Sequence, residues 1–189
     1  MTAQKESMRN SITTGTSEHP LLSLLGIEKT FKNDIFKPPV QSLKGVDLDF
    51  PEGFCTGLVG HNGAGKTTTI RMILGLIAPD RGRILYRGEP ISRNRRATIG
   101  YMAESARFPG GLSASEILRT QLALHRKPKD KQHPEQVTQK LRAVGLQNHA
   151  NRRIRDFSKG MMQRLAWAHA TIHDPNLLIL DEPFTGLDP

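Results

Sequence analysis

The chain has little of what would mark a disulfide-stabilised, zinc-binding or membrane-spanning protein. Cys55 is the only cysteine among 189 residues, so no intramolecular disulfide and no cysteine-based zinc cluster can form. We expect Cys55 to be a small buried hydrophobic residue. The longest uninterrupted apolar stretches, such as residues 177–180, are far shorter than the ~18 to 20 residues of a bilayer-spanning helix. The chain is therefore predicted not to cross a membrane alone.

The N-terminus lacks the apolar core of a signal peptide. Residues 1–20 are polar and rich in Ser and Thr, which predicts a flexible tail on a cytoplasmic protein. The chain as a whole is 24% charged and 37% hydrophobic, a balance typical of a soluble globular domain. We expect a single folded domain after the tail.

Positive charge is concentrated in one part of the chain. The formal net charge is +9, and residues 87–160 hold 16 Lys or Arg against 6 Asp or Glu. A local basic excess suits nucleic acid, acidic lipid headgroups or an acidic partner, and it equally suits a solvated surface. Charge alone leaves these alternatives open.

The spacing of apolar and turn-forming residues predicts an α/β chain. Strands are expected over residues 23–31 and 46–50, as a small β layer, and then over 54–59, 84–86, 98–102 and 177–180. Helices are expected over residues 66–77, behind a capping box at Ser113, from Pro134 to about Gly145, and from Ser158 to about Ile172. The helices thus cluster between two strand-rich segments.

A glycine-rich loop separates the strand expected at 54–59 from the helix expected at 66–77. It fits the P-loop pattern G-x-x-x-x-G-K-[ST] through Gly60, His61, Asn62, Gly63, Ala64, Gly65, Lys66 and Thr67, with Thr68 next to it. Glycines let consecutive backbone N–H groups face phosphate oxygens, and the helix N-terminus favours negative charge. We expect Lys66 to reach the β- and γ-phosphates and Thr67 to offer its hydroxyl to Mg²⁺. The loop predicts nucleotide binding.

An apolar strand that ends in two carboxylates lies downstream of this loop. Residues 177–180 lead into Asp181 and Glu182, as when a buried parallel strand delivers acidic groups to a sheet edge. We expect Asp181 to hold Mg²⁺ through water and Glu182 to polarise the attacking water. Many strands end in Asp or Glu, so it is the P-loop upstream that makes this pattern predict a Walker B motif.

A third segment opens the last expected helix. Residues 157–164, FSKGMMQR, resemble a variant form of the signature motif of ABC-type ATPases, a form similar to that of export-type members. Residues 185–188, TGLD, resemble the D-loop of that family. The order P-loop, signature, Walker B, D-loop separates this family from GTPases, kinases and other P-loop proteins. The resemblance runs from about Leu24 to the last residue.

The resemblance implies a fold and its division into domains. It implies a P-loop NTPase core with a mostly parallel sheet, an N-terminal antiparallel β layer and a helical subdomain at about residues 104–160. The nucleotide-binding domain would cover residues 21–189. The family also carries a switch histidine on a strand beyond the D-loop, and the sequence stops at Pro189 before such a residue. We therefore expect an incomplete sequence that lacks the C-terminal strands.

The resemblance also implies roles for further residues. Phe31 matches the aromatic residue on which adenine stacks, with a core aromatic as the alternative. Ser158 and Gly160 match signature positions that contact the γ-phosphate held by the opposite subunit, and Asp188 would lie at the same interface. Glu104 stands where the family has its Q-loop glutamine, and its carboxylate can ligate Mg²⁺ or a water. His169 and His173 precede the Walker B strand, so we expect partly exposed helix histidines rather than the switch residue.

Together these motifs imply the ATP-binding subunit of an ABC transporter, of exporter type. It would pair with a second nucleotide-binding domain around two Mg-ATP and power a separate membrane subunit from the inner face of the cell membrane, with Lys66, Glu104 and Glu182 as catalytic groups. No aromatic residues are interleaved with the basic ones, so we favour a solvated or membrane-proximal face over a nucleic-acid partner. The alternatives are a soluble ABC ATPase acting on nucleic acid or ribosomes, and a non-hydrolysing ATP-binding fragment.

Overall fold

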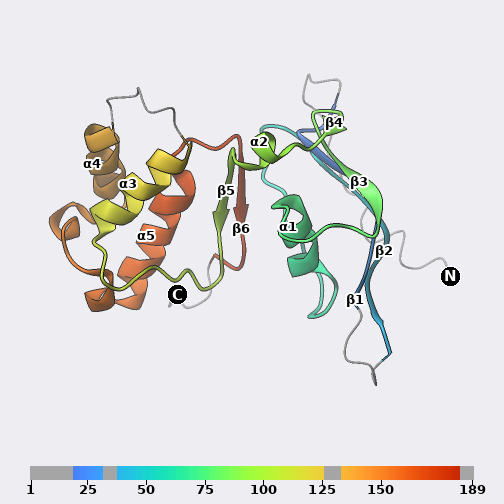
Figure 1. Ribbon diagram of the computed structural model, residues 1–189, viewed down its shortest axis with the longest axis horizontal. Helices are drawn as coiled ribbons and strands as arrows, with labels where there is room; N and C mark the ends of the chain where they lie inside the picture. The colour runs from blue at the N-terminus through green and yellow to red at the C-terminus, as the bar shows by residue number, and fades with distance from the viewer. Residues whose placement is uncertain (1–18, 32–37, 126–132, 184–189) are drawn as a thin grey trace. The chain divides into compact units, whose positions relative to one another are not determined.

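The computed structural model describes residues 19–31, 38–125 and 133–183, with the helices and strands labelled in Figure 1. The chain divides into two compact units, Met1–Ser92 and Arg93–Pro189. The predicted tail, apart from its last two residues, and the D-loop with Asp188 lie outside the described residues.

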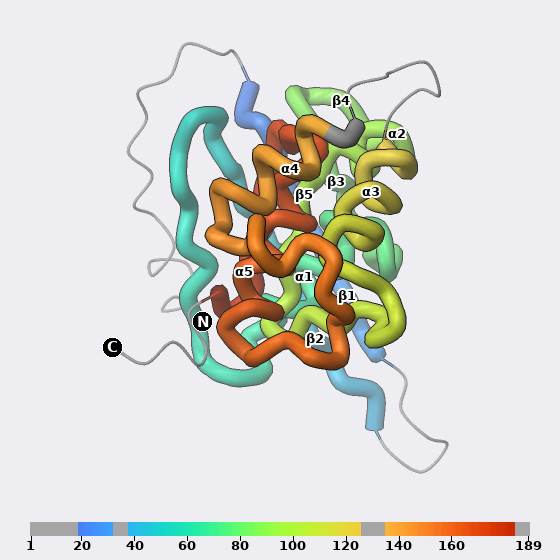
Figure 2. The backbone as a smooth tube through the Cα atoms, turned by 90° about the vertical axis from the view of Figure 1, so that its left-hand side faces the viewer, coloured from blue at the N-terminus to red at the C-terminus, as the bar shows by residue number. Residues whose placement is uncertain are grey.

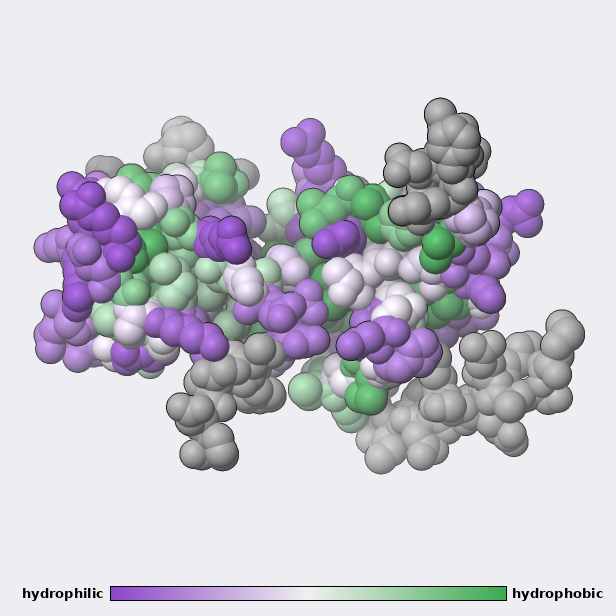
Figure 3. Space-filling model, turned by 90° about the horizontal axis from the view of Figure 1, so that it is seen from below, coloured by the Kyte–Doolittle hydropathy of each residue, from purple (hydrophilic) through white to green (hydrophobic). Residues whose placement is uncertain are grey.

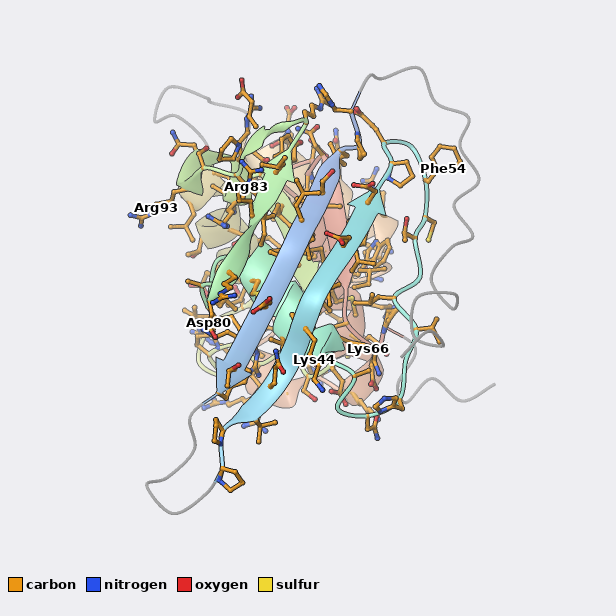
Figure 4. The ribbon with its side chains drawn as sticks, turned by 90° about the vertical axis from the view of Figure 1, so that its right-hand side faces the viewer. Lys44, Phe54, Lys66, Asp80, Arg83 and Arg93 are labelled. Atoms are coloured by element: carbon orange, nitrogen blue, oxygen red, sulfur yellow. The ribbon has the colours of Figure 1, made fainter. Side chains whose placement is uncertain are left out.

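The first unit is built on an antiparallel sheet with the strand order β2-β1-β3-β4. Its strands are β1 (Leu22–Phe31), β2 (Val40–Phe50), β3 (Arg81–Tyr86) and β4 (Glu89–Pro90). The predicted antiparallel β layer is confirmed, and its second strand begins six residues earlier than expected because Val40 pairs with Phe31. Helix α1 (Lys66–Ile73) covers one face of this sheet (Figures 1 and 4).

Helix α1 ends before the predicted residue 77, and its last turn shows why. Gly75 takes up a left-handed conformation with φ 75°. Its N–H donates to Met72 O at 3.0 Å, and the N–H of Leu76 donates to Arg71 O at 2.8 Å. This pair of bonds is the Schellman motif, which satisfies the final carbonyls and ends the helix.

The strand predicted over residues 54–59 is not formed. After the turn that follows β2, this stretch doubles back without joining a sheet of the described residues (Figures 2 and 4). Phe54 is 44% exposed and Val59 is 86% exposed. The prediction that Cys55 is buried is also wrong, because the thiol lies on this unpaired stretch and is exposed. An apolar run becomes a strand only where a neighbouring strand supplies hydrogen-bond partners.

The second unit combines a parallel strand pair with a helical cluster. Strands β5 (Ile99–Met102) and β6 (Leu177–Leu180) pair in parallel, from Ile99 opposite Leu177 to Met102 opposite Leu180. The helices are α2 (Arg93–Arg96), α3 (Ala114–His125), α4 (His133–Ala143) and α5 (Lys159–Thr171), with 3-10 turns at Gln147–His149 and Ile154–Asp156. Within the described part of the chain, no helix is both long enough and apolar enough to span a bilayer.

Helix α5 is the centre of this unit. It contacts β5 on one side and α3 and α4 on the other (Figure 1), and α3 and α4 lie side by side in both Figure 1 and Figure 2. The core between the helices consists of fully buried aliphatic side chains: Leu118, Leu122, Leu141, Leu146, Ile154 and Leu165. Burial of side chains of this size is the main force holding the cluster together.

Two of these helices begin at the residues that the sequence indicates. The Ser113 N–H donates to Glu116 Oε2 at 2.7 Å, and the Glu116 N–H donates to Ser113 Oγ at 3.3 Å, which confirms the capping box of α3. These bonds from Ser113 are the main reason why the pKa of Glu116 lies below its ordinary value. Ser158 caps α5, since its Oγ accepts from the Met161 N–H at 3.3 Å.

Candidate functional site

The predicted P-loop leads directly into α1. The Ala64 N–H donates to His61 O at 3.1 Å, and Gly63 and Gly65 have φ angles of 83° and 92°, a left-handed conformation that glycine adopts without strain. Gly65 is the N-cap of α1, and among the described residues no side chain caps the helix and no acidic residue lies in its first turn. The backbone N–H groups at this end therefore suit an anion.

Lys66 brings a positive charge to the same loop. Its ammonium donates to Gly60 O at 2.5 Å and to His61 O at 3.2 Å. In Figure 4 the Lys66 side chain lies beside the lower part of β2, at the start of α1. Thr67, the next residue, is exposed. The loop thus presents an ammonium, a hydroxyl and backbone donors together, which is the donor set that phosphate groups need.

Two residues of β2 that the sequence reasoning missed support this loop. Ser42 Oγ and Thr68 Oγ1 are hydrogen bonded at 3.0 Å. Leu43 is buried and packs so closely on Gly65 that an added Cβ would lie 2.5 Å from Leu43 Cδ2 and 3.0 Å from Ser42 O. Nothing in the P-loop spacing points to these residues, because only the fold brings β2 to the loop.

The predicted acidic residues follow the carboxyl ends of the parallel strands. The Asp181 N–H donates to Met102 O at 2.9 Å, which extends the pairing of β5 and β6 by one residue. Asp181 Oδ2 also lies 3.4 Å from the Tyr101 hydroxyl. Glu104 follows β5 as Glu182 follows β6, and both are exposed. The register therefore places Glu104, Asp181 and Glu182 at the carboxyl ends of the two strands, the end at which parallel sheets bind ligands.

The signature segment forms the start of α5. Ser158 and Gly160 are both exposed. A Cβ placed on Gly160 would have no neighbour within 4 Å in the structure described, so this chain's own packing does not require glycine there. The first turn of α5 can therefore be approached closely by another group.

Phe31 closes β1 opposite Val40 and is half-buried. The ammonium of Lys29 lies 5.8 Å from the centre of its ring, within the range of a cation–π contact. Adenine stacking on Phe31 stays a prediction.

Histidines gather where α3 and α5 end. The rings of His125 and His173 stack at 4.0 Å and 10°. Burial lowers the pKa of His173 to about 4, and His125 and His169 act in the same direction, against the backbone of Ile99 and the charge of Asp174. Burial likewise lowers the pKa of His169. The prediction of helix histidines holds for His169 but not for His173, which lies beyond the end of α5 at Thr171.

Part of the predicted basic surface is exposed on the second unit. Arg152, Arg153 and Arg155 are all exposed. Hydrophilic side chains, in purple, cover much of the surface of this unit that Figure 3 shows. Arg153 also hydrogen bonds to Gly111 O and lies 3.6 Å from Glu116 Oε2. Part of the positive charge is thus engaged by the chain itself.

The sequence profile of the ABC transporter family matches residues 43–185. The chain belongs to the ABC transporter family. It is 37% identical over 172 residues to the uncharacterised ABC transporter ATP-binding protein YhaQ of Bacillus subtilis, covering 89% of this chain and 54% of that protein. It is 42% identical over 147 residues to the Nod factor export ATP-binding protein I of Cupriavidus metallidurans, covering 76% of this chain and 48% of that protein.

A solved structure agrees with this ABC transporter family assignment. A chain described as the ATP-binding subunit of an ABC transporter superimposes with a TM-score of 0.75 at 30% identity, over 89% of this chain and 69% of that one. The predicted P-loop NTPase fold is thereby confirmed. The family match includes the P-loop, the signature segment and the Walker B strand, whereas Phe31 precedes it. The chain spans about half the length of the two relatives named above.

Proposed function

We propose that the chain binds and hydrolyses Mg-ATP as the nucleotide-binding subunit of an ABC transporter and powers transport through a separate membrane subunit. The observation that carries this proposal is the P-loop, where the Lys66 ammonium lies on the loop carbonyls next to the N-terminus of α1, which no side chain in the described part of the chain caps. The phosphates of ATP are the anion that a P-loop of this spacing accommodates. Residues 60–68 would bind them.

Mg²⁺ fits the oxygen donors that the motifs supply. It prefers hydroxyl, carboxylate and water oxygens, which Thr67, Asp181 and Glu104 can provide. The ion would neutralise charge on the phosphates. Lys66 would stabilise the β- and γ-phosphates, and Glu182 would orient the attacking water and act as its general base.

A second nucleotide-binding domain would complete the site. Ser158 and Gly160 are exposed at the start of α5, where a phosphate of the opposite subunit could approach the helix N-terminus. We place Asp188 at the same interface. The domain would cover residues 21–189, with a helical subdomain at about 104–160, and would dock on its membrane subunit at the inner face of the membrane. The Nod factor export relative supports an exporter.

The trapped dimer tests this proposal. With Mg-ATP, Glu182→Gln should lose hydrolysis, because a neutral amide is too weak a base to take a proton from water. It should keep nucleotide, because the P-loop is intact. Size-exclusion chromatography with light scattering should then show an ATP-dependent dimer, and Lys66→Ala should stay monomeric. Hydrolysis by Glu182→Gln at the rate of the unsubstituted protein would refute the role of this carboxylate.

A further inference from the structure

Glu182 has an unusual backbone conformation. Its φ angle is 48°, in the left-handed region that non-glycine residues rarely occupy. The next residue is Pro183, whose ring restricts the preceding residue to extended conformations. Both effects oppose the observed geometry. Such a conformation persists only where the surrounding structure holds it.

Hydrogen bonds hold the chain on both sides of Glu182. Before it, the Asp181 N–H donates to Met102 O at 2.9 Å and fixes the end of β6 to β5. After it, Gln163 Nε2 donates to Pro183 O at 2.6 Å. The second bond joins residues 20 positions apart and is partly buried, so water competes with it less than at an open surface.

Gln163 lies in the second turn of α5 and its side chain is half-buried. The helix is anchored by Leu165, Ala168 and Ala170, which are at most 1% exposed. A donor on such a rigid element fixes the position of what it binds better than a donor on a loop. Gln163 thus ties a packed helix to the turn that carries Glu182.

We infer that Gln163 is a positioning residue for Glu182, holding the carboxylate in the orientation needed for ATP hydrolysis. This inference rests on the proposed function, and it makes the position of α5 a regulator of Glu182. The helix that carries Gln163 begins with Ser158 and Gly160, the residues proposed to meet the opposite subunit's nucleotide. Movement of α5 on dimer formation would reach Glu182 of the same chain through the hydrogen bond from Gln163 to Pro183 O.

Gln163→Met in the full chain tests this inference. Methionine keeps the length and unbranched shape of the side chain but has no N–H donor. We expect kcat for ATP hydrolysis to fall about tenfold, the rate equivalent of the free energy of roughly one hydrogen bond, because Glu182 is held less well in its reactive orientation. The KM for ATP should be unchanged because the P-loop is untouched. Thr171→Val is the matched control, since it removes a hydroxyl that donates to Trp167 O at 2.8 Å on the same helix. Its kcat and KM should match those of the unsubstituted protein.

A second readout does not depend on hydrolysis. Amide hydrogen exchange at Asp181, measured by NMR, should accelerate about tenfold in Gln163→Met and stay unchanged in Thr171→Val, because the turn after β6 loses its tie to α5. Unchanged exchange and kcat in Gln163→Met would overturn the inference. A fall in kcat together with a raised KM and a lower thermal stability would also overturn it, because a merely structural role predicts that combination. If the unsubstituted protein does not hydrolyse ATP, the proposed function fails, and exchange alone decides whether Gln163 holds the turn that carries Glu182.

Discussion

Adding a methyl group at two different P-loop glycines should cost different amounts of unfolding free energy. Gly63 and Gly65 both have left-handed φ angles, so alanine at either position costs about 1 to 2 kcal/mol in backbone strain. Among the described residues, a Cβ on Gly63 has no neighbour within 4 Å, whereas a Cβ on Gly65 lies 2.5 Å from Leu43 Cδ2. Overpacking of this kind costs about 1 to 3 kcal/mol more. Gly63→Ala should therefore lose about 1 to 2 kcal/mol of unfolding free energy, and Gly65→Ala about 2 to 5 kcal/mol.

The substitution Leu43→Ala separates the overpacking cost of Gly65→Ala from its backbone strain. It removes the atoms nearest to the new methyl group, although Ser42 O stays at 3.0 Å. The double variant Leu43→Ala/Gly65→Ala should lose about 1 to 3 kcal/mol less than the two single variants together, while Leu43→Ala/Gly63→Ala should be additive. Urea unfolding followed by circular dichroism measures all five variants. Equal losses for the two glycine variants, or additivity in both cycles, would refute the packing of β2 on the P-loop.

Two further predictions concern the second unit. Burial lowers the pKa of His173 to about 4 in the folded chain, so as the pH falls the unfolded chain takes up a proton on this ring before the folded chain does. The contribution of His173 to the free energy of unfolding is therefore complete above pH ~6.5 and falls as the pH drops toward 4. After allowance for solvent screening the loss is about 1 kcal/mol. In His173→Phe the difference between the free energies of unfolding in urea at pH 7 and pH 5 should shrink by that amount. An undiminished difference would exclude His173 as its source. Ser158→Ala should lose about 1 kcal/mol, because the cap of α5 disappears, whereas Ser158→Thr should keep most of it; faster amide exchange confined to the first turn of α5 checks this, and unchanged exchange there contradicts it.

Local signals predicted the elements that depend on local contacts. The capping groups at Ser113 and Ser158 lie within three residues of their partners, so the sequence alone located the starts of α3 and α5. The parallel direction of β6 was predicted, because an apolar run before Asp181 is typical of a parallel strand, but its partner β5 was not.

The errors and omissions concern contacts between distant residues. Residues 54–59 have the composition of a strand, but pairing depends on a neighbour that composition does not reveal, so the stretch and Cys55 with it are exposed. Leu43 and Gln163 were missed for the same reason. Leu43 packs on Gly65, 22 positions away, and Gln163 donates a hydrogen bond to Pro183 O, 20 positions away.

Calorimetric titration with Mg-ATP tests the central claim most directly, namely that the loop at the start of α1 binds the phosphates of ATP. The Lys66 ammonium would exchange its bonds to Gly60 O and His61 O for charge-assisted bonds to phosphate. Loss of such bonds in Lys66→Ala should weaken ATP binding about 10- to 100-fold, and the unchanged circular dichroism spectrum of the variant should show that its fold is intact. Equal ATP affinity in the two proteins, or no ATP binding by the unsubstituted protein, would contradict the claim.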